Sequence, residues 1–197
     1  DNVAILQYNY PETYESLFAC FKLGAAAVPI NFRLHPKEFA FIIDHSDAKA
    51  VILSSEFNQS IFDVQDRIPK AQSLISLKGG EDKLLDYENL LAQEDDDFTD
   101  KDVDPDDLAW LFYTSGTTGM PKGAMLTHRN LIGMTMNFYA DIAPGFSYRD
   151  VILHAAPLSH GSGLYGLPNI GKGATNVILP SKSFDPSLVF QNIEKHK

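Results

Sequence analysis

The sequence predicts an α/β protein whose mostly parallel sheet is covered by helices on both faces. Short apolar runs typical of strands alternate with amphipathic segments typical of helices, and this order characterises parallel sheets with helical crossovers. The 197 residues are enough to bury a sizeable core. The sequence contains no internal repeat, no secretion signal and no apolar run approaching the ~20 residues of a membrane span. We therefore expect a cytoplasmic protein.

The first predicted elements are a strand at residues 2–6 and a helix that ends near Gly24. Apolar side chains recur in this helix at the i, i+3, i+4, i+7 spacing of one buried face, and they are Tyr14, Leu17, Phe18 and Phe21. Cys20 is the single cysteine, so an internal disulfide is excluded, and we expect it to pack on the buried face. Gly24 can take the left-handed conformation that ends a helix.

A strand at residues 26–30, a helix at 36–44 and a strand at 49–54 follow. Phe39, Ile42 and Ile43 lie on one side of that helix and mark its buried face. These segments complete the alternation on which the fold prediction rests.

The second half begins with a strand-like run at residues 108–113, followed by a loop at 114–123. Thr127 is a candidate helix N-cap beyond the loop. Another strand-like run covers 151–154, and a helix starts at Pro186, since proline favours the first helical turn. We expect a first α/β subdomain at 1–148, which contains the loop, and the truncated start of a second one at 149–197.

The ends of the chain suggest that it is part of a longer protein. It begins at Asp1 with no initiator methionine and stops inside the last predicted helix, which has no glycine stop. We therefore expect a fragment.

Charge is concentrated in one segment. The net charge is −10, yet residues 81–107 contain 13 acidic residues and two lysines. We expect a solvated linker at about 93–107 rather than a metal site or a surface for a basic partner. Residues 108–197 carry a balance of +3, which suits an anionic ligand, and the scattered basic residues argue against nucleic-acid binding.

The loop at residues 114–123 has the composition of a phosphate-binding loop. Seven of its ten residues are Gly, Ser or Thr. Glycines 116, 119 and 123 can take positive φ and let backbone N–H groups converge on an anion. The hydroxyls can donate to phosphate oxygens, and Pro121 stiffens the backbone before Lys122. The predicted phosphate-binding residues are Thr114, Ser115, Gly116, Thr117, Thr118, Gly119, Lys122 and Gly123.

This loop is not the P-loop of NTPases. That motif requires Gly-Lys followed by Ser or Thr, whereas here Lys122 precedes Gly123 and Ala124 follows. A kinase-like or ATPase use of the loop is therefore disfavoured. A nucleotide-binding module without catalysis, or a fragment that merely folds, remains open.

Several blocks together resemble the adenylate-forming superfamily, which comprises acyl- and aryl-CoA synthetases, luciferases and the adenylation domains of peptide synthetases. The loop is similar to the family's phosphate-binding signature. Residues 21–34 with 36–38, 124–131 and 157–164 resemble three further family blocks in the family order. The Leu-Ser-His-Gly pattern at 158–161 is most similar to acid–CoA ligases, although adenylation for a carrier protein stays open as an alternative.

The resemblance implies an activity and a set of roles. A carboxylic acid would be activated with ATP and Mg²⁺ to an acyl-adenylate, and coenzyme A would then accept the acyl group. Thr118 and Lys122 would stabilise the departing phosphates, and His160 would position the carboxylate. The acid pocket would include His160, Gly161, Ser162 and Gly163. The resemblance also implies that the magnesium-binding glutamate, the ribose-binding aspartate and the C-terminal domain with its catalytic lysine lie beyond this chain, which itself contains no metal site.

Residues 151–173 contain two further features, a glycine pattern and a histidine. Gly161, Gly163 and Gly166 spell G-x-G-x-x-G after a strand, as in a dinucleotide-binding fold. We expect Pro168 and the glycines after it to prevent the helix that such a site needs. We assign no role to His154.

Overall fold

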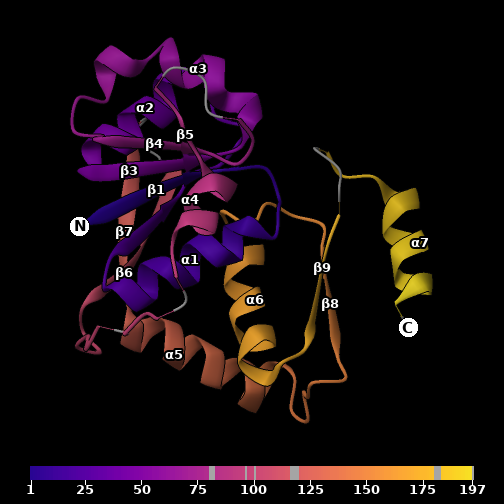
Figure 1. Ribbon diagram of the computed structural model, residues 1–197. Helices are drawn as coiled ribbons and strands as arrows, with labels where there is room; N and C mark the ends of the chain where they lie inside the picture. Colours follow the sequence, from indigo (N-terminus) through magenta and orange to yellow (C-terminus); the bar gives the residue numbers. More distant parts are fainter. Residues whose placement is uncertain (80–82, 96, 100, 116–119, 180–182, 197) are drawn as a thin grey trace.

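The computed structural model describes residues 1–79, 83–95, 97–99, 101–115, 120–179 and 183–196. A seven-stranded sheet has the order β5-β4-β3-β1-β2-β6-β7, and a second sheet pairs β8 with β9 (Figure 1). Neighbouring strands are parallel except for the antiparallel pair β6–β7. The strands are β1 (Asn2–Leu6), β2 (Ala26–Pro29), β3 (Ala48–Leu53), β4 (Ser73–Ser76), β5 (Leu85–Asp86), β6 (Leu108–Ser115), β7 (Pro121–Thr127), β8 (Val151–His154) and β9 (Thr175–Ile178).

Helices cover both faces of the large sheet, as expected. Ala4 and Leu6 of β1 face a core with Phe39 of α2, whereas Ile5 faces the opposite core with Leu17 of α1. The helices are α1 (Glu12–Leu23), α2 (Pro36–His45), α3 (Asn58–Phe62), α4 (Tyr87–Gln93), α5 (His128–Asn137), α6 (Gly161–Lys172) and α7 (Pro186–Lys195), with short 3-10 turns at Ser55–Phe57 and Gln65–Arg67 and a π-helical turn at Phe138–Ile142. Figure 1 shows α2 and α3 on one side of the sheet and α1, α5 and α6 on the other.

The elements predicted in the first half are confirmed to within a residue or two. Helix α1 ends at Gly24, which has φ 67° and donates its N–H to the carbonyls of Cys20 and Phe21. Cys20 is 2% exposed, and burial raises the pKa of its thiol to about 12. Helix α2 begins with a capping box in which His35 accepts from the backbone of Lys37, a feature that the sequence analysis did not anticipate.

Two elements of the second half differ from the predictions. Residues 121–127 form β7, so the loop joins two antiparallel strands and is not followed directly by a helix. Thr127 nevertheless caps the next helix, α5, as predicted, by accepting the N–H of Asn130. Helix α6 forms although Pro168 lies inside it, and it ends at Gly173 with φ 67°. The expectation that Pro168 would prevent this helix was therefore wrong.

Strands β8 and β9 are parallel and α6 connects them, so the three elements form a β–α–β unit. The same helix joins this second sheet to the first. Leu167 of α6 and Leu158 of the preceding loop belong to the same apolar cluster as Trp110 of β6. Helix α7 lies beyond the second sheet (Figure 1). Within the described residues, no helix combines the length and apolar character needed to cross a membrane.

Candidate functional site

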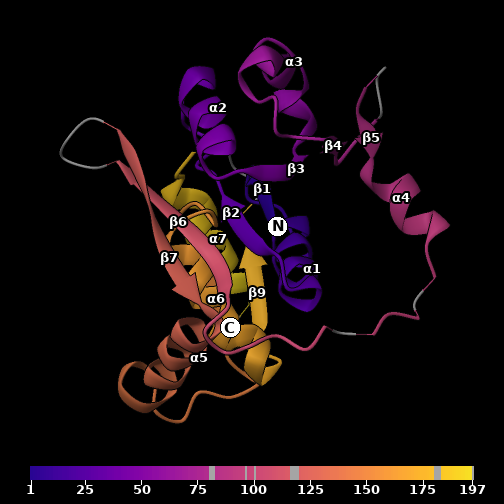
Figure 2. The ribbon, with the colours of Figure 1, turned by 90° about the vertical axis from the view of Figure 1, so that its left-hand side faces the viewer.

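The described residues of the predicted phosphate loop lie at the far end of the β6–β7 hairpin, which extends from the body of the protein (Figure 2). Lys122 is paired with Thr114 across the hairpin, and both side chains are exposed. Ser115 pairs with Pro121 in the last described step of the ladder. The predicted ligands Gly116, Thr117, Thr118 and Gly119 lie outside the described residues. The structure therefore places the cation at the rim of the loop and leaves the central donors undescribed.

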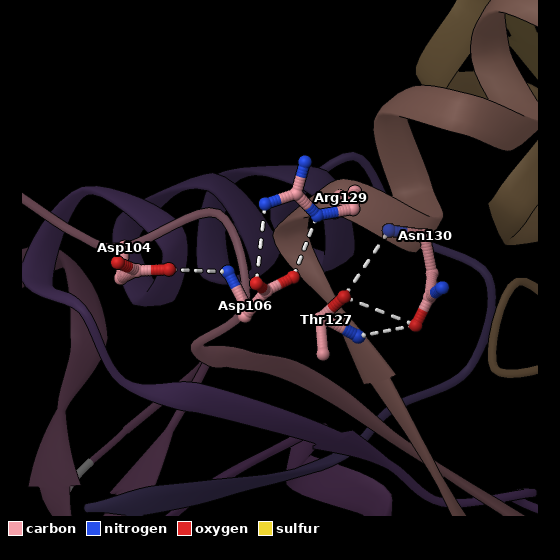
Figure 3. Close-up of polar contacts among 5 residues, drawn as sticks. All are labelled: Asp104, Asp106, Thr127, Arg129 and Asn130. Atoms are coloured by element: carbon pink, nitrogen blue, oxygen red, sulfur yellow. Dashed lines mark hydrogen bonds and ion pairs between the residues drawn. The ribbon is translucent and has the colours of Figure 1, made fainter.

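Polar contacts fix the base of the hairpin, at the end opposite the loop (Figure 3). The guanidinium of Arg129 donates from Nε to Asp106 Oδ1 at 2.6 Å and from Nη2 to Oδ2 at 3.1 Å. The side-chain oxygen of Asn130 accepts from the Thr127 N–H at 3.0 Å, which completes the capping box of α5. Asp106 precedes β6 and Arg129 follows β7, so this cluster ties the entry of the hairpin to its exit.

A tyrosine braces the hairpin just below the loop. Gly123 of β7 pairs with Tyr113 of β6, and a Cβ on Gly123 would lie 3.0 Å from the Tyr113 ring. The Tyr113 hydroxyl is 2.7 Å from Nδ1 of His45 on α2. Gly123 does not have a positive φ, so that part of the expectation was wrong. Its lack of a side chain instead lets the tyrosine ring lie across the strand.

His160 lies beside the strand that carries the loop. It is the residue before α6, and its ring packs edge-on against Phe112 of β6 with centroids 4.9 Å apart. Phe112 is two residues before Thr114, where the loop begins. Phe112 and His160 are 48 residues apart in sequence, and this ring contact brings the hairpin and the predicted acid-pocket motif together.

An open pocket of about 770 Å³ borders His160. Gly161, Ser162 and Tyr165 of α6 line it on one side, and Arg33 lines it from the segment after β2. None of the described lining residues is acidic and Arg33 is a cation, so the described lining carries a positive charge that suits a carboxylate. Arg33 was missed in the sequence, where it is one of many surface cations. Gly163 does not line this pocket in the described structure; it is buried.

Asn9 fixes the loop that leads to His160. Its Nδ2 donates to the Ala156 carbonyl at 2.8 Å, and its Oδ1 accepts from the Leu158 N–H at 2.9 Å. One amide side chain thus satisfies two backbone groups of a segment 147 and 149 residues away. No signal in the sequence distinguishes Asn9 from an ordinary turn asparagine.

His154, to which the sequence analysis gave no role, is a buried polar hub. It is fully buried at the end of β8. Its Nδ1 is 2.9 Å from Ser162 Oγ, and its Nε2 is 2.8 Å from Asn176 Oδ1. Burial lowers the pKa of His154, whereas the hydrogen bonds oppose this effect. The titratable group that packs against it is Tyr14 of α1, whose own pKa burial raises.

The glycines of the G-x-G-x-x-G segment are required by contacts within the protein. A Cβ on Gly163 would lie 1.9 Å from the Leu158 carbonyl oxygen, and one on Gly166 would lie 1.8 Å from the Tyr14 hydroxyl. Nothing lies within 4 Å of a Cβ on Gly161. Two of the three glycines therefore allow α6 to approach its own loop and α1, and these contacts explain the spacing without a dinucleotide.

The fold and these contacts define a class: an α/β protein in which the strand leading into a glycine-rich sequence contacts a histidine that borders an open pocket. A family model described as "AMP-binding enzyme" matches residues 1–197. The chain belongs to this family of AMP-binding enzymes, as the resemblance of the sequence blocks predicted.

The chain is also similar to curated proteins and to solved structures. The chain is 37% identical to a feruloyl-CoA synthase of Amycolatopsis sp. and 32% identical to 4-hydroxybutyrate–CoA ligase 2 of Metallosphaera sedula; each match covers 100% of this chain and 37% of the relative. A long-chain-fatty-acid CoA ligase of Rhodopseudomonas palustris, itself described as putative, superposes with a TM-score of 0.89 at 25% identity, over 100% of this chain and 48% of that structure. The N-terminal domain of FACL13 from Mycobacterium tuberculosis gives 0.86 at 30% identity, over 99% and 47%. The chain thus spans about 37% of the length of these curated relatives.

Proposed function

We propose that the full-length parent of this chain is an AMP-forming acid–CoA ligase, and that this chain supplies its phosphate loop and much of its acid pocket. The substrates would be a carboxylic acid, ATP and coenzyme A. The two curated relatives reported above support the proposal, because they are named as a CoA synthase and a CoA ligase and each match covers the whole length of this chain. We also propose that the chain divides near residues 148 and 149, where the second sheet begins.

The observation that carries the proposal is the contact between Phe112 and His160. Activation of an acid by ATP requires the carboxylate and the phosphates to be held next to each other, because an attacking oxygen must be placed within a few ångströms of phosphorus. The hairpin that carries the loop meets the acid-pocket motif at this ring pair. The positive charge of Arg33 in the pocket gives independent support.

The residues of this chain would each make a separate contribution. A carboxylate oxygen attacks the α-phosphorus of ATP, and pyrophosphate leaves with increased negative charge. Lys122 and Thr118 would stabilise that charge, together with Thr114, Ser115 and the backbone of the glycine-rich loop. His160 would orient the carboxylate and exclude water with its flat ring, which Phe112 supports. Gly161 and Ser162 would form the adjoining wall.

The arrangement of possible metal ligands can be stated for the described part of the chain. No group of three His, Cys, Asp or Glu side chains is arranged there to hold a metal ion. We therefore derive no step through Mg²⁺ from these residues.

Acid-dependent ATP–pyrophosphate exchange tests the proposal. The full-length parent is assayed with a panel of fatty and aromatic acids, and the 197-residue chain is assayed beside it. Exchange with one class of acid would establish the ligase and its substrate group. ATP binding without exchange for any acid would contradict it and leave a nucleotide-binding module. For the chain alone, its short length relative to the curated relatives favours this second function.

A further inference from the structure

Ser162 and His154 form a pair whose hydrogen atoms can be assigned from the contacts. Asn176 Oδ1, 2.8 Å from His154 Nε2, can only accept a hydrogen bond, so Nε2 carries the proton. A neutral imidazole has one N–H, and Nδ1 is therefore an acceptor. The Ser162 hydroxyl, 2.9 Å away, must then donate its hydrogen to Nδ1.

The surroundings of His154 favour this neutral state. The ring is fully buried, and burial lowers its pKa. The Tyr14 hydroxyl lies 3.4 Å from both His154 Nε2 and the Gly163 carbonyl. Because Nε2 already donates to Asn176, the tyrosine hydrogen goes to the Gly163 carbonyl, and the contact at Nδ1 is the one with Ser162.

This arrangement decides what Ser162 offers to the pocket. A serine hydroxyl has one hydrogen to donate and two lone pairs that accept. Ser162 is half-buried and lines the pocket beside His160 and Tyr165. Since its hydrogen is committed to His154, its oxygen offers the pocket only an acceptor.

We propose that Ser162 is a specificity-determining residue of the acid pocket and that His154 positions it, so that the pair selects acids bearing a hydroxyl or amino donor. The proposal rests on the proposed ligase function. A donor on the acid would pair with Ser162 Oγ, whereas an ether at the same place would oppose lone pair to lone pair. One neutral hydrogen bond in an open pocket predicts a preference of roughly 3- to 10-fold in kcat/KM.

The test compares matched acids in the full-length parent by ATP–pyrophosphate exchange. The probes are benzoate with its three hydroxy and three methoxy isomers, and butyrate with its hydroxy isomers. We expect at least one hydroxy acid to exceed both its deoxy and its methoxy partner. Ser162→Ala should bring the hydroxy-to-deoxy ratio close to one. Ser187→Ala, an exposed serine on α7, should keep the wild-type ratio.

A second variant tests the part played by His154. His154→Leu frees the Ser162 hydrogen, so the hydroxyl can donate, and the methoxy acids should gain relative to the deoxy acids. Each ratio is measured within one preparation and does not depend on the fraction of protein that is folded. A wild-type ratio near one for every pair, or a preference that survives Ser162→Ala, would overturn the proposal alone. No exchange with any acid would overturn the ligase function as well.

Discussion

The close approach of α6 to its preceding loop predicts a large effect of adding one methyl group at residue 163. In Gly163→Ala, the new Cβ would meet the Leu158 carbonyl oxygen at 1.9 Å, about 1.5 Å short of ordinary van der Waals contact. The oxygen belongs to backbone and cannot rotate away. The Leu158 N–H is held by Asn9, and its side chain is 1% exposed in the core. The helix must therefore move off the loop.

The size of the effect follows from two opposing terms. Alanine is favoured over glycine inside a helix by about 1 kcal/mol. Overpacking a well-packed site costs about 1–3 kcal/mol, and a clash of this depth with backbone belongs at the upper end. The expected net loss is about 2 kcal/mol. Gly133→Ala in α5 is the matched control, because nothing lies within 4 Å of its Cβ, and it should gain about 0.5–1 kcal/mol.

Urea unfolding of the 197-residue chain measures the difference. Trp110 is the only tryptophan, is fully buried and belongs to the same cluster as Leu158, so its fluorescence reports on this contact. The two variants should differ by about 3 kcal/mol, or roughly 6–12 °C in Tm for a chain of this size. Equal stability of Gly163→Ala and Gly133→Ala would refute the packing of α6 on the loop.

Three further predictions concern other parts of the site. In the full-length parent, Lys122→Ala should slow acid-dependent pyrophosphate exchange by roughly 10- to 10³-fold, whereas Lys37→Ala, exposed on α2, should not; near-normal exchange by the first variant would disprove the assignment. Asn9→Ala removes the partner of both the Leu158 N–H and the Ala156 carbonyl and should lower the free energy of unfolding by about 1–3 kcal/mol; full stability of this variant would contradict the clamp. Burial lowers the pKa of His154 below 6.5, so the unfolded chain binds a proton at this histidine more readily than the folded chain does. The wild type should therefore lose stability below about pH 6.5, by at most about 1.4 kcal/mol per pH unit. His154→Gln should remove this loss from the pH dependence of the free energy of unfolding, as measured with urea. The same pH dependence in the wild type and in His154→Gln would contradict the assignment of the loss to His154.

The fold was largely predictable because its elements are encoded locally. The spacing of Tyr14 and Leu17 marks the buried face of α1, and Gly24 marks its end. Strand β7 was missed because residues 121–127 contain Pro121 and Gly123 and lack a continuous apolar run. Its partner is β6, and pairing across the hairpin outweighs the weak local preference.

The candidate site was predictable only in part. Two separate motifs marked the segments that the structure brings together: the loop with Lys122 through the distinctive composition of phosphate loops, and the block with His160 through its resemblance to the family. Asn9 and His154 carry no such signal, because their partners lie far away in the sequence, and Arg33 is identified only by its place in the lining of the pocket. A lone buried histidine becomes interpretable only when the partners of both its ring nitrogens are known.

Through these distant contacts, residues 9–14 influence the positions of residues that line the pocket. Asn9 follows β1 and holds the backbone on which His160 sits, while Tyr14 of α1 packs against His154 and leaves room for α6 only because residue 166 is glycine. Ser162 faces the pocket from that same helix. A substitution near residues 9–14 that shifts α1 must therefore shift both the ring that would orient the carboxylate and the hydroxyl that would select the acid. Under the proposed function, acid preference should depend on residues nearly 150 positions away from the pocket motif, even though none of them belongs to that motif.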